Sequence, residues 1–460
     1  MKSRFTKKII HGGVEIKPDF FFLPYINPDE HIIYAPLREF VAVINTDAKN
    51  AIIKRLNNHT LHESEQGIID AFEKRGFFND ELYKMPLVDE EFAPTRVTLF
   101  PADSCNLRCR YCYASAENGG NMMSIDTARA AIDLIAENTK RKKYDLFSVG
   151  FHGNGEPFTA FEIVQECCDY IEHVGERDGL KYIITTATNG VLPDEALDYL
   201  IAWISDANVS SDILPDIQNN QRPLANGGKS FDAVDNTLKR LDKAGVQYGI
   251  RATITQESVS RLREMASFVK ENYPKCKLLH LEPVFEVGRA LTNHQVMPDP
   301  YIFVMEFLKA QEELSGTEIR LVYSGDRQET LCQCFCSVCS NNFTVTAEGN
   351  ITSCYEICTY KDPRAYKFIY GHFNKERGSF DFEKKVLDTL LELQVKNIPF
   401  CKDCFCKWHC GGDCVAKVLG SNPVSEHRGS ARCVINRALT YRRILQKLGV
   451  DTVNTEPKFI

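Results

Sequence analysis

Three cysteines fall within eight residues in the stretch Ser104-Cys105-Asn106-Leu107-Arg108-Cys109-Arg110-Tyr111-Cys112, directly after the apolar residues 97–100. Thiolates are soft ligands that bind zinc and iron-sulfur clusters. Three of them at the end of a strand hold one face of a metal centre and leave one coordination position without a protein ligand. An open position is typical of a reactive site, because a structural site is closed by a fourth ligand. The stretch therefore predicts a reactive metal centre, with a zinc knuckle or three buried thiols as alternatives.

The composition is that of an ordinary globular chain. Its 460 residues are 43% hydrophobic and 25% charged, which allows two or three domains. The net charge of −7 gives no reason to expect a nucleic acid partner. No apolar run reaches the roughly 20 residues that span a bilayer, and no signal-peptide core follows the N-terminus. We expect a cytoplasmic protein without membrane contact, in which most of the 18 cysteines bind metal rather than form disulfides.

Apolar runs and amphipathic segments alternate from residue 94 to residue 314. Six strands are expected at 97–100, 146–151, 182–186, 207–211, 247–253 and 277–281, with helices at 125–138, 161–175, 194–203, 231–244, 259–272 and 299–314. Six strand-helix units predict an α/β fold, with a parallel sheet covered by helices. Residues 1–93 carry no cysteine and predict a small α+β module, with two short strands within 32–44 and helices at 48–56 and 63–75.

The cysteine stretch, with Tyr111 before its last cysteine, resembles the signature of the radical S-adenosylmethionine (radical SAM) enzymes. The resemblance implies a 4Fe-4S cluster on Cys105, Cys109 and Cys112 whose open iron binds S-adenosylmethionine. One electron then cleaves the sulfonium to give a 5′-deoxyadenosyl radical that abstracts hydrogen from the substrate. The fold implied for residues 94–314 is a partial (β/α)6 TIM-like barrel with the reactive centre at the C-terminal ends of the strands.

Further segments resemble the cofactor contacts of that family, each at the end of an expected strand. In Gly153-Asn154-Gly155-Glu156-Pro157, Asn154 replaces the usual first glycine, while Gly155 and Glu156 match the turn that receives the methionyl amino group. The resemblance implies the same cofactor role for Asn189, Ser210 and Asn236, and Tyr111 belongs to the signature itself. Taken singly, each is also compatible with a capping or turn residue.

Twelve cysteines lie between residues 332 and 433, and their spacing is the second signal. A compact hairpin is expected at 343–352, between Cys339 and Cys354. A pair of zinc ribbons is one reading. The order resembles the SPASM extension, which implies two auxiliary 4Fe-4S clusters, and thus three clusters in all. The implied ligands are Cys339, Cys354, Cys414 and one of Cys332, Cys334 and Cys336, with Cys334 favoured, for the first auxiliary cluster, and Cys401, Cys404, Cys410 and Cys433 for the second.

Two residues are candidates for a catalytic role. Sulfatase-maturing relatives carry a catalytic aspartate after the hairpin cysteine, whereas here Tyr355 and Glu356 follow Cys354. Tyr355 is therefore either a proton or electron donor or an aromatic cover for the cluster. Arg251, like Glu282, lies on or just after a strand and points either into the barrel or toward the helices.

These resemblances imply an oxidoreductase that modifies a ribosomally made precursor peptide, for example by forming a crosslink. The alternatives are a sulfatase-type maturase acting on a protein Cys or Ser, and a non-catalytic zinc or iron-sulfur scaffold. Residues 1–93 look like a PqqD-like peptide-recognition module or a plain extension. The other expected parts are a linker at 315–331, the SPASM domain at 332–437 and a C-terminal helix and tail at 438–460. A flavodoxin- or ferredoxin-type electron donor is the second expected partner.

Overall fold

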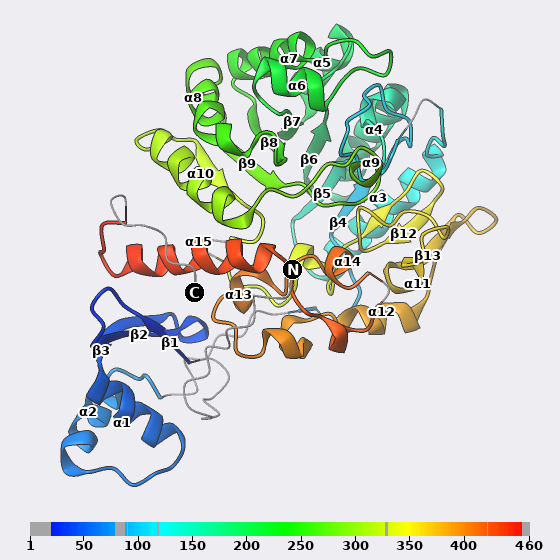
Figure 1. The fold of residues 1–460 in the computed structure, drawn as a ribbon. Helices are drawn as coiled ribbons and strands as arrows, with labels where there is room; N and C mark the ends of the chain where they lie inside the picture. The colour runs from blue at the N-terminus through cyan, green and yellow to red at the C-terminus, as the bar shows by residue number, and fades with distance from the viewer. Residues whose placement is uncertain are drawn as a thin grey trace.

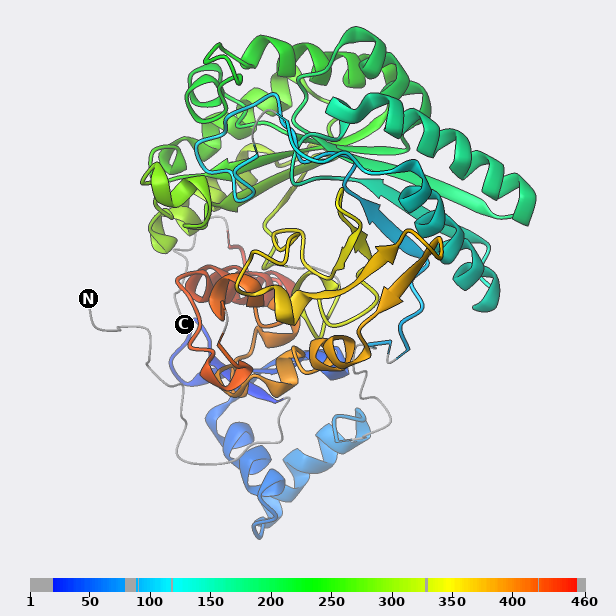
Figure 2. The ribbon, with the colours of Figure 1, turned by 90° about the vertical axis from the view of Figure 1, so that its right-hand side faces the viewer.

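The computed structural model describes residues 20–78, 88–89, 91–116, 119–326, 330–420 and 422–452. The first 19 residues of the expected N-terminal module and the last eight of the expected tail lie outside these ranges. Figures 1 and 2 show the described chain as a helix-covered sheet at one end, the C-terminal region in the middle and the N-terminal module at the other end. In the described ranges, no helix combines the length and the apolar character that crossing a membrane would require.

A single 11-stranded sheet has the order β10-β9-β8-β7-β6-β5-β4-β11-β12-β13-β14. Its first seven strands are parallel to one another, and helices α3, α4, α5, α7, α8 and α10 surround this part of the sheet (Figure 1). These strands are β4 (Arg96–Leu99), β5 (Leu146–Phe151), β6 (Lys181–Thr188), β7 (Asp206–Ser210), β8 (Gln247–Ile254), β9 (Leu278–Pro283) and β10 (Arg320–Val322). The helices are α3 (Ile125–Arg141), α4 (Phe161–Asp178), α5 (Asp194–Trp203), α6 (Pro215–Gln221), α7 (Phe231–Ala244), α8 (Leu262–Asn272), α9 (Arg289–Thr292) and α10 (Pro300–Glu313).

The predicted α/β class and its six strand-helix units are confirmed, and the structure adds elements between them. Strand β10 lies within the segment expected to be a linker, residues 315–331, and pairs in parallel with β9. It has three residues, of which Arg320 is exposed, so it is too short for a period to be read from the sequence. The short helices α6 and α9 were not expected either.

The predicted hairpin at 343–352 is present and extends the barrel sheet. Strands β11 (Thr344–Val345) and β12 (Asn350–Thr352) are antiparallel, and β11 pairs in parallel with β4, Thr344 opposite Thr98. Strands β13 (Ile369–Asn374) and β14 (Ser379–Phe382) complete the sheet. The cysteine-rich region is thus joined to the barrel by backbone hydrogen bonds, including Thr98 N to Phe343 O at 2.9 Å.

Short helices make up most of the remaining C-terminal region. They are η5 (Phe335–Ser337), α11 (Ala365–Phe368), α12 (Lys384–Leu391), η6 (Val395–Asn397), η7 (Pro399–Cys401), α13 (Lys407–Cys410), α14 (Val415–Val418) and η8 (Val424–Glu426). The long helix α15 (Arg432–Lys447) follows, and it begins before residue 438, where the expected C-terminal part was to start.

The N-terminal module has an antiparallel sheet of order β1-β2-β3, formed by β1 (Phe21–Pro24), β2 (Glu30–Ala35) and β3 (Phe40–Asn45). Helices α1 (Thr46–Leu56) and α2 (Glu63–Lys74) cover one face, where Ile33 and Ile52 are fully buried. The other face packs on the cysteine-rich region and α15, and Tyr441 Oη donates to Pro24 O at 2.7 Å. Both faces of the sheet are therefore buried.

Candidate active site

The cysteine loop follows β4 and is held by a segment that runs beside it. Arg108 N donates to Pro223 O and Arg110 N to Gln221 O, both at 2.8 Å, and Ala225 N donates to Asn106 O at 2.9 Å. These bonds come from the last residue of α6 and from the turn that follows it. The loop that carries the three thiols therefore has a fixed path at the C-terminal end of the sheet.

Two glycines let the neighbouring turns approach the cysteine loop closely. A Cβ atom at Gly155 would lie 2.7 Å from the carbonyl carbons of Asp103 and Ser104, and Glu156 N donates to Ser104 O at 2.8 Å. Gly288 adopts a φ of +56° against the backbone of Cys112, and Arg289 N donates to Cys112 O at 2.9 Å. Both ends of the loop are thus clamped by backbone contacts that a side chain would block.

Glu156 and Asn189 meet beside Cys105, as the motifs predicted. One oxygen of the buried Glu156 carboxylate accepts from Asn189 N at 2.7 Å, and the other accepts from Thr188 Oγ1 at 2.8 Å. Burial raises the pKa of Glu156 to about 7 despite these bonds. Asn189 Nδ2 lies 3.7 Å from Cys105 Sγ and donates to Asn106 Oδ1 at 2.7 Å. An acceptor for an ammonium group therefore stands next to the first thiol.

A buried network under Cys109 contains two residues that the sequence did not single out. Tyr111 Oη donates to Asp212 Oδ2 at 2.6 Å and accepts from Arg222 Nη1 at 2.9 Å. Burial alone would lower the pKa of Arg222, but Cys109, Tyr111 and Asp212 outweigh it and raise the pKa, so the guanidinium is charged. A buried cation beside thiols favours their anionic form. Asp212 stands two residues after the candidate Ser210 and Arg222 directly follows α6, and neither was predicted as a site residue.

The remaining cofactor candidates are placed differently. Ser210 is half-buried at the end of β7, opposite Arg251 of β8. Asn236 is exposed on α7, while its neighbour Thr237 is buried and donates to Gly190 O at 2.8 Å. Among the described residues, no hydrogen bond joins Asn236 to the cysteine loop, so its cofactor role stays a prediction.

The three thiols of the loop are suited to a metal cluster. Burial raises the pKa of Cys105, and Glu156 and Cys112 add to this shift. Burial also raises the pKa of Cys109 to about 12, and the other two loop thiols add to that shift. Such thiols stay protonated unless a metal binds, because coordination deprotonates a thiol outright. Among the described side chains, no group of three or more His, Cys, Asp or Glu is arranged around a single metal ion. Soft donors, the Asn189 amide and the Arg222 cation fit an iron-sulfur cluster.

The four ligands predicted for the second auxiliary cluster lie near enough for their charges to interact, and their role as ligands stays a prediction. Burial raises the pKa of Cys401, and the neighbouring Cys410, Cys404 and Cys433 add to that shift. Cys406, which was not assigned to a cluster, lies in the same place, with its Sγ 3.3 Å from Cys404 Sγ.

The ligands predicted for the first auxiliary cluster are only partly together. Burial, then Cys414, raises the pKa of Cys354, so these two thiols are neighbours. Cys334 and Cys339 are joined by a disulfide. A sulfur in a disulfide does not ligate iron, so their predicted role needs the reduced pair. The contact of Cys334 with Cys339 favours Cys334 over Cys332 and Cys336 as the fourth ligand. Cys336 lies near Cys414, however, so the choice of fourth ligand stays a prediction.

Tyr355 and Arg251 both reach the inner face of the barrel. Tyr355 Oη lies 3.0 Å from Thr98 Oγ1, and its ring packs edge-on against Phe100 and 4.9 Å from the His152 ring. Arg251 alternates with the buried Ile250 and Ala252, which face the helices, so it projects inward, and the sequence had left its direction open. The C-terminal region thus contributes Tyr355 to the barrel interior.

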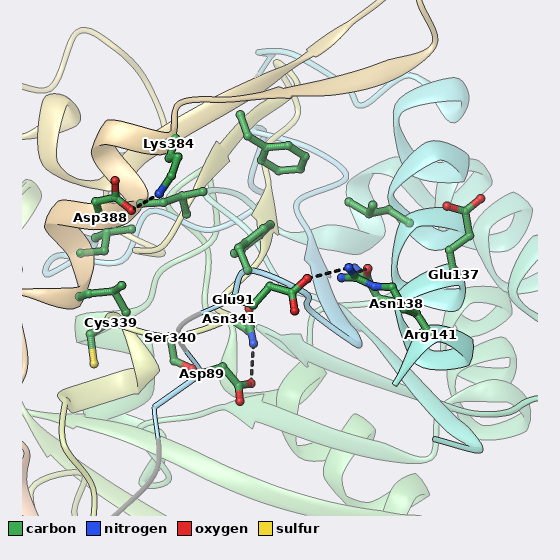
Figure 3. A pocket seen from close by; sticks show the side chains of 16 residues that line it. Asp89, Glu91, Glu137, Asn138, Arg141, Cys339, Ser340, Asn341, Lys384 and Asp388 are labelled. Atoms are coloured by element: carbon green, nitrogen blue, oxygen red, sulfur yellow. Dashed lines mark hydrogen bonds and ion pairs between the residues drawn. The ribbon is translucent and has the colours of Figure 1, made fainter. Parts of the chain in front are cut away.

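A cavity of about 680 Å³ lies elsewhere, between α3 and α12, with Cys339 in its wall (Figure 3). Arg141 pairs with Glu91 at 2.6 Å and Lys384 pairs with Asp388 at 2.7 Å along its lining. The cavity is outside the barrel and most of its charges are paired with one another, so it is not the reaction centre.

Comparison with known proteins finds a family model and several relatives that are similar to this chain. Residues 99–269 match the model of the Radical SAM superfamily. The chain is 28% identical over 166 residues to an uncharacterized protein of Methanocaldococcus jannaschii, covering 36% of this chain and 54% of that protein. It is 20% identical over 324 residues to the cysteine-type anaerobic sulfatase-maturating enzyme of Clostridium novyi, covering 66% of this chain and 83% of that enzyme. The chain thus spans about half the length of the first relative and most of the second.

Two solved structures share the fold. The structure of anSMEcpe with bound AdoMet has a TM-score of 0.57 and 18% identity, and covers 78% of this chain and 100% of that one. Streptococcus suis SuiB bound to the precursor peptide SuiA has a TM-score of 0.53 and 15% identity, and covers 90% of this chain and 99% of SuiB. At these identities the likeness shows that the chain shares the fold of these two proteins, and it shows the fold alone.

Proposed function

We propose that the chain is a radical SAM enzyme of the maturase type that oxidises a residue of a ribosomally made precursor peptide, forming a crosslink or a related modification. The observation that carries the proposal is the meeting of Cys105, Glu156 and Asn189 at the C-terminal ends of the barrel strands. SuiB, whose fold covers 90% of this chain, binds a precursor peptide.

The cluster on Cys105, Cys109 and Cys112 and S-adenosylmethionine would supply a 5′-deoxyadenosyl radical, which abstracts hydrogen from carbon. The residues of the chain would bind and orient the cofactor and the peptide. Glu156 would accept the methionyl ammonium, and Asn189 and Ser210 would contact the rest of the cofactor. Arg222 would stabilise the negative charge of the thiolates from below. Tyr355 and Arg251 would line the substrate space.

The auxiliary ligands would hold two further 4Fe-4S clusters that accept the second electron. Cys401, Cys404, Cys410 and Cys433 lie together, which supports one cluster. Cys354 and Cys414, with Cys339 and Cys334 once reduced, are the ligands we assign to the other. A flavodoxin- or ferredoxin-type protein would deliver the first electron.

The N-terminal module offers an edge for the peptide. Among the described strands, β3 pairs only with β2, so its other edge has backbone groups free for an added strand. Extended peptides commonly bind proteins by adding a strand to such an edge. The sheet is packed on the auxiliary region, so a peptide bound there would be tethered to the catalytic part of the chain.

A sulfatase-type maturase acting on a protein Cys or Ser is the second candidate. The likeness to the Clostridium novyi enzyme favours it, whereas Tyr355 stands where those enzymes carry an aspartate. The non-catalytic scaffold is not supported, because the radical SAM domain identifies an enzyme.

The test combines metal content with cofactor cleavage. After anaerobic reconstitution we expect about 12 irons per chain, three clusters of four, and 5′-deoxyadenosine from S-adenosylmethionine with dithionite. The variant with Cys105, Cys109 and Cys112 all changed to Ala should retain about 8 irons and form no 5′-deoxyadenosine. A synthetic peptide encoded by a short reading frame beside the gene should lose two hydrogens in mass. Cleavage in the triple variant, or a peptide of unchanged mass beside active cofactor cleavage, would contradict the proposal.

A further inference from the structure

A fifth thiol, that of Cys406, lies among the four predicted ligands of the second auxiliary cluster, and the proposed function gives it no role. Its Sγ is 3.3 Å from Cys404 Sγ. Hydrogen bonds to the thiols of Cys404 and Cys410, together with burial, raise the pKa of Cys406. The sulfur of Cys406 is therefore in contact with two predicted ligands at once.

Two single turns of backbone fix where these thiols stand. In the first turn, Cys404 N donates to Cys401 O at 3.1 Å, so Cys401 and Cys404, three residues apart, lie on one side of the turn. In the second turn, Cys410 N donates to Cys406 O at 3.1 Å, at the point where α13 begins. Residues four apart in a helical turn share a face. Cys406 is thus presented beside Cys410 in the same way as Cys404 is presented beside Cys401.

Cys404 and Cys406 are too close together to bind two different irons. Metal-sulfur bonds of about 2.3 Å in tetrahedral geometry place two thiolates of one metal about 3.8 Å apart. Thiolates on different irons of a 4Fe-4S cluster lie further apart, because the irons themselves are separated. The separation of 3.3 Å between Cys404 Sγ and Cys406 Sγ is shorter than either value. The pair therefore fits two donors that face one coordination position and occupy it in turn.

The N-terminal sheet encloses this pair of thiols. Cys406 is 2% exposed and packs in one cluster with Phe21 and Tyr34 of that sheet, where the half-buried Cys404 also makes contact. Because oxidation of a thiol follows its exposure, a thiol in this position stays reduced and available as a ligand. Cys276, another thiol without an assigned cluster, differs, since its Sγ donates to Leu278 O at 3.4 Å in the core of the barrel.

We propose that Cys406 is an alternative ligand of the second auxiliary cluster, which takes the coordination position of Cys404 when Cys404 is displaced or absent. The inference rests on the proposed function, which assigns this cluster to the chain. In the exchange, the iron-sulfur bond to Cys404 breaks and the bond to Cys406 forms, while the proton that Cys406 loses passes to Cys404. No electron is transferred, and the cluster keeps four sulfur ligands from the protein.

The test compares single with double loss of the pair in the reconstituted full-length enzyme. Cys401→Ala removes one predicted ligand and is the reference, with iron falling from about 12 per chain to about 11 or fewer. Cys404→Ala and Cys406→Ala should each keep about 12 irons, whereas Cys404→Ala/Cys406→Ala should lose as much iron as Cys401→Ala. Cys404→Ala/Cys276→Ala is the matched control and should keep about 12. Iron lost from Cys404→Ala alone, or full iron in Cys404→Ala/Cys406→Ala, would overturn the proposal.

Serine variants decide the same question with the side-chain size nearly unchanged, so that the protein folds. The EPR spectrum of dithionite-reduced Cys404→Ser should match that of wild type, because Cys406 supplies the sulfur ligand. The spectrum of Cys404→Ser/Cys406→Ser should differ from both. A Cys404→Ser spectrum that already differs from wild type would show that Cys406 only donates a hydrogen bond to Cys404, and this would refute the exchange.

These measurements need no peptide, so they separate the inference from the proposed function. A wild type that binds about 12 irons but modifies no peptide would place the failure in the proposed function, and the iron contents of the variants would still decide the role of Cys406. A wild type that binds about 8 irons or fewer would overturn the inference, because the second auxiliary cluster would not be there to bind.

Discussion

Gly155→Ala tests whether the turn after β5 clamps the cysteine loop. The new Cβ would lie 2.7 Å from the carbonyl carbons of Asp103 and Ser104, where carbon atoms need about 3.5 Å. Ser104 O would lie closer still, so the turn and the loop must separate by at least about 0.8 Å, which stretches the bond from Glu156 N to Ser104 O beyond hydrogen-bonding range. We expect a loss of about 0.5–1.5 kcal/mol for that bond and about 1–3 kcal/mol for overpacking.

The assay is iron content together with thermal unfolding of the reconstituted enzyme. A total of about 2–4 kcal/mol corresponds to a fall of about 5–10 °C in the unfolding midpoint of the barrel. Because the displaced loop carries the three thiols, iron should fall from about 12 toward about 8 per chain. Gly67→Ala is the control, since nothing lies within 4 Å of its added Cβ on α2. A Gly155→Ala protein with full iron and a midpoint within about 1 °C of wild type would refute the clamp.

Three further predictions concern single side chains. Arg432→Met leaves the carboxylates of Glu282 and Asp413 without their cation and should lower the free energy of unfolding by about 3–5 kcal/mol, measured by thermal or denaturant unfolding. The control Lys384→Met removes an exposed ion pair and should cost about 1 kcal/mol or less. Equal costs for the two variants would contradict the prediction. Because the pKa of Glu156 is raised to about 7, the folded state binds a proton more tightly than the unfolded state does. The difference in unfolding midpoint between wild type and Glu156→Gln should therefore fall as the pH rises from about 5 to 7 and stay level above about pH 7. A difference that rises with pH would refute this sign. Tyr355→Phe keeps the ring contacts and loses the hydrogen bond to Thr98, so the free energy of unfolding should change by about 1 kcal/mol. A loss of modified peptide while 5′-deoxyadenosine formation stays unchanged would show that the hydroxyl takes part in the peptide modification.

The sequence was informative where local chemistry decides the structure. Helix α7 has the predicted bounds, 231–244, because an amphipathic stretch ends at Gly245, whose φ of +73° terminates a helix. The strand-helix alternation succeeded for the same reason, since each unit carries its own apolar pattern and stop signal. Cysteine, glycine and glutamate motifs at strand ends then pointed to one edge of the sheet.

Features that depend on contacts between distant segments were missed. Tyr111, Asp212 and Arg222 form one network, yet each residue alone has an ordinary neighbourhood in the sequence. Strand β1 was not expected because three apolar residues before Pro24 show no period, and the strand exists only through pairing with β2. Cysteine spacing could not rank Cys332, Cys334 and Cys336, because their partners come from elsewhere in the chain.

The pairing of β4 with β11 has a consequence for how the protein is made. Strand β4 precedes the whole barrel in the chain, but its second neighbour arrives only when residue 344 has been synthesised. Until then the growing chain presents an unpaired apolar strand edge, which is a template for aggregation. A barrel truncated after residue 322 would keep that edge permanently, so it should precipitate or bind chaperones even though all seven parallel strands are present. The C-terminal region is thus needed to cover the edge of the barrel sheet, in addition to any role in holding auxiliary clusters.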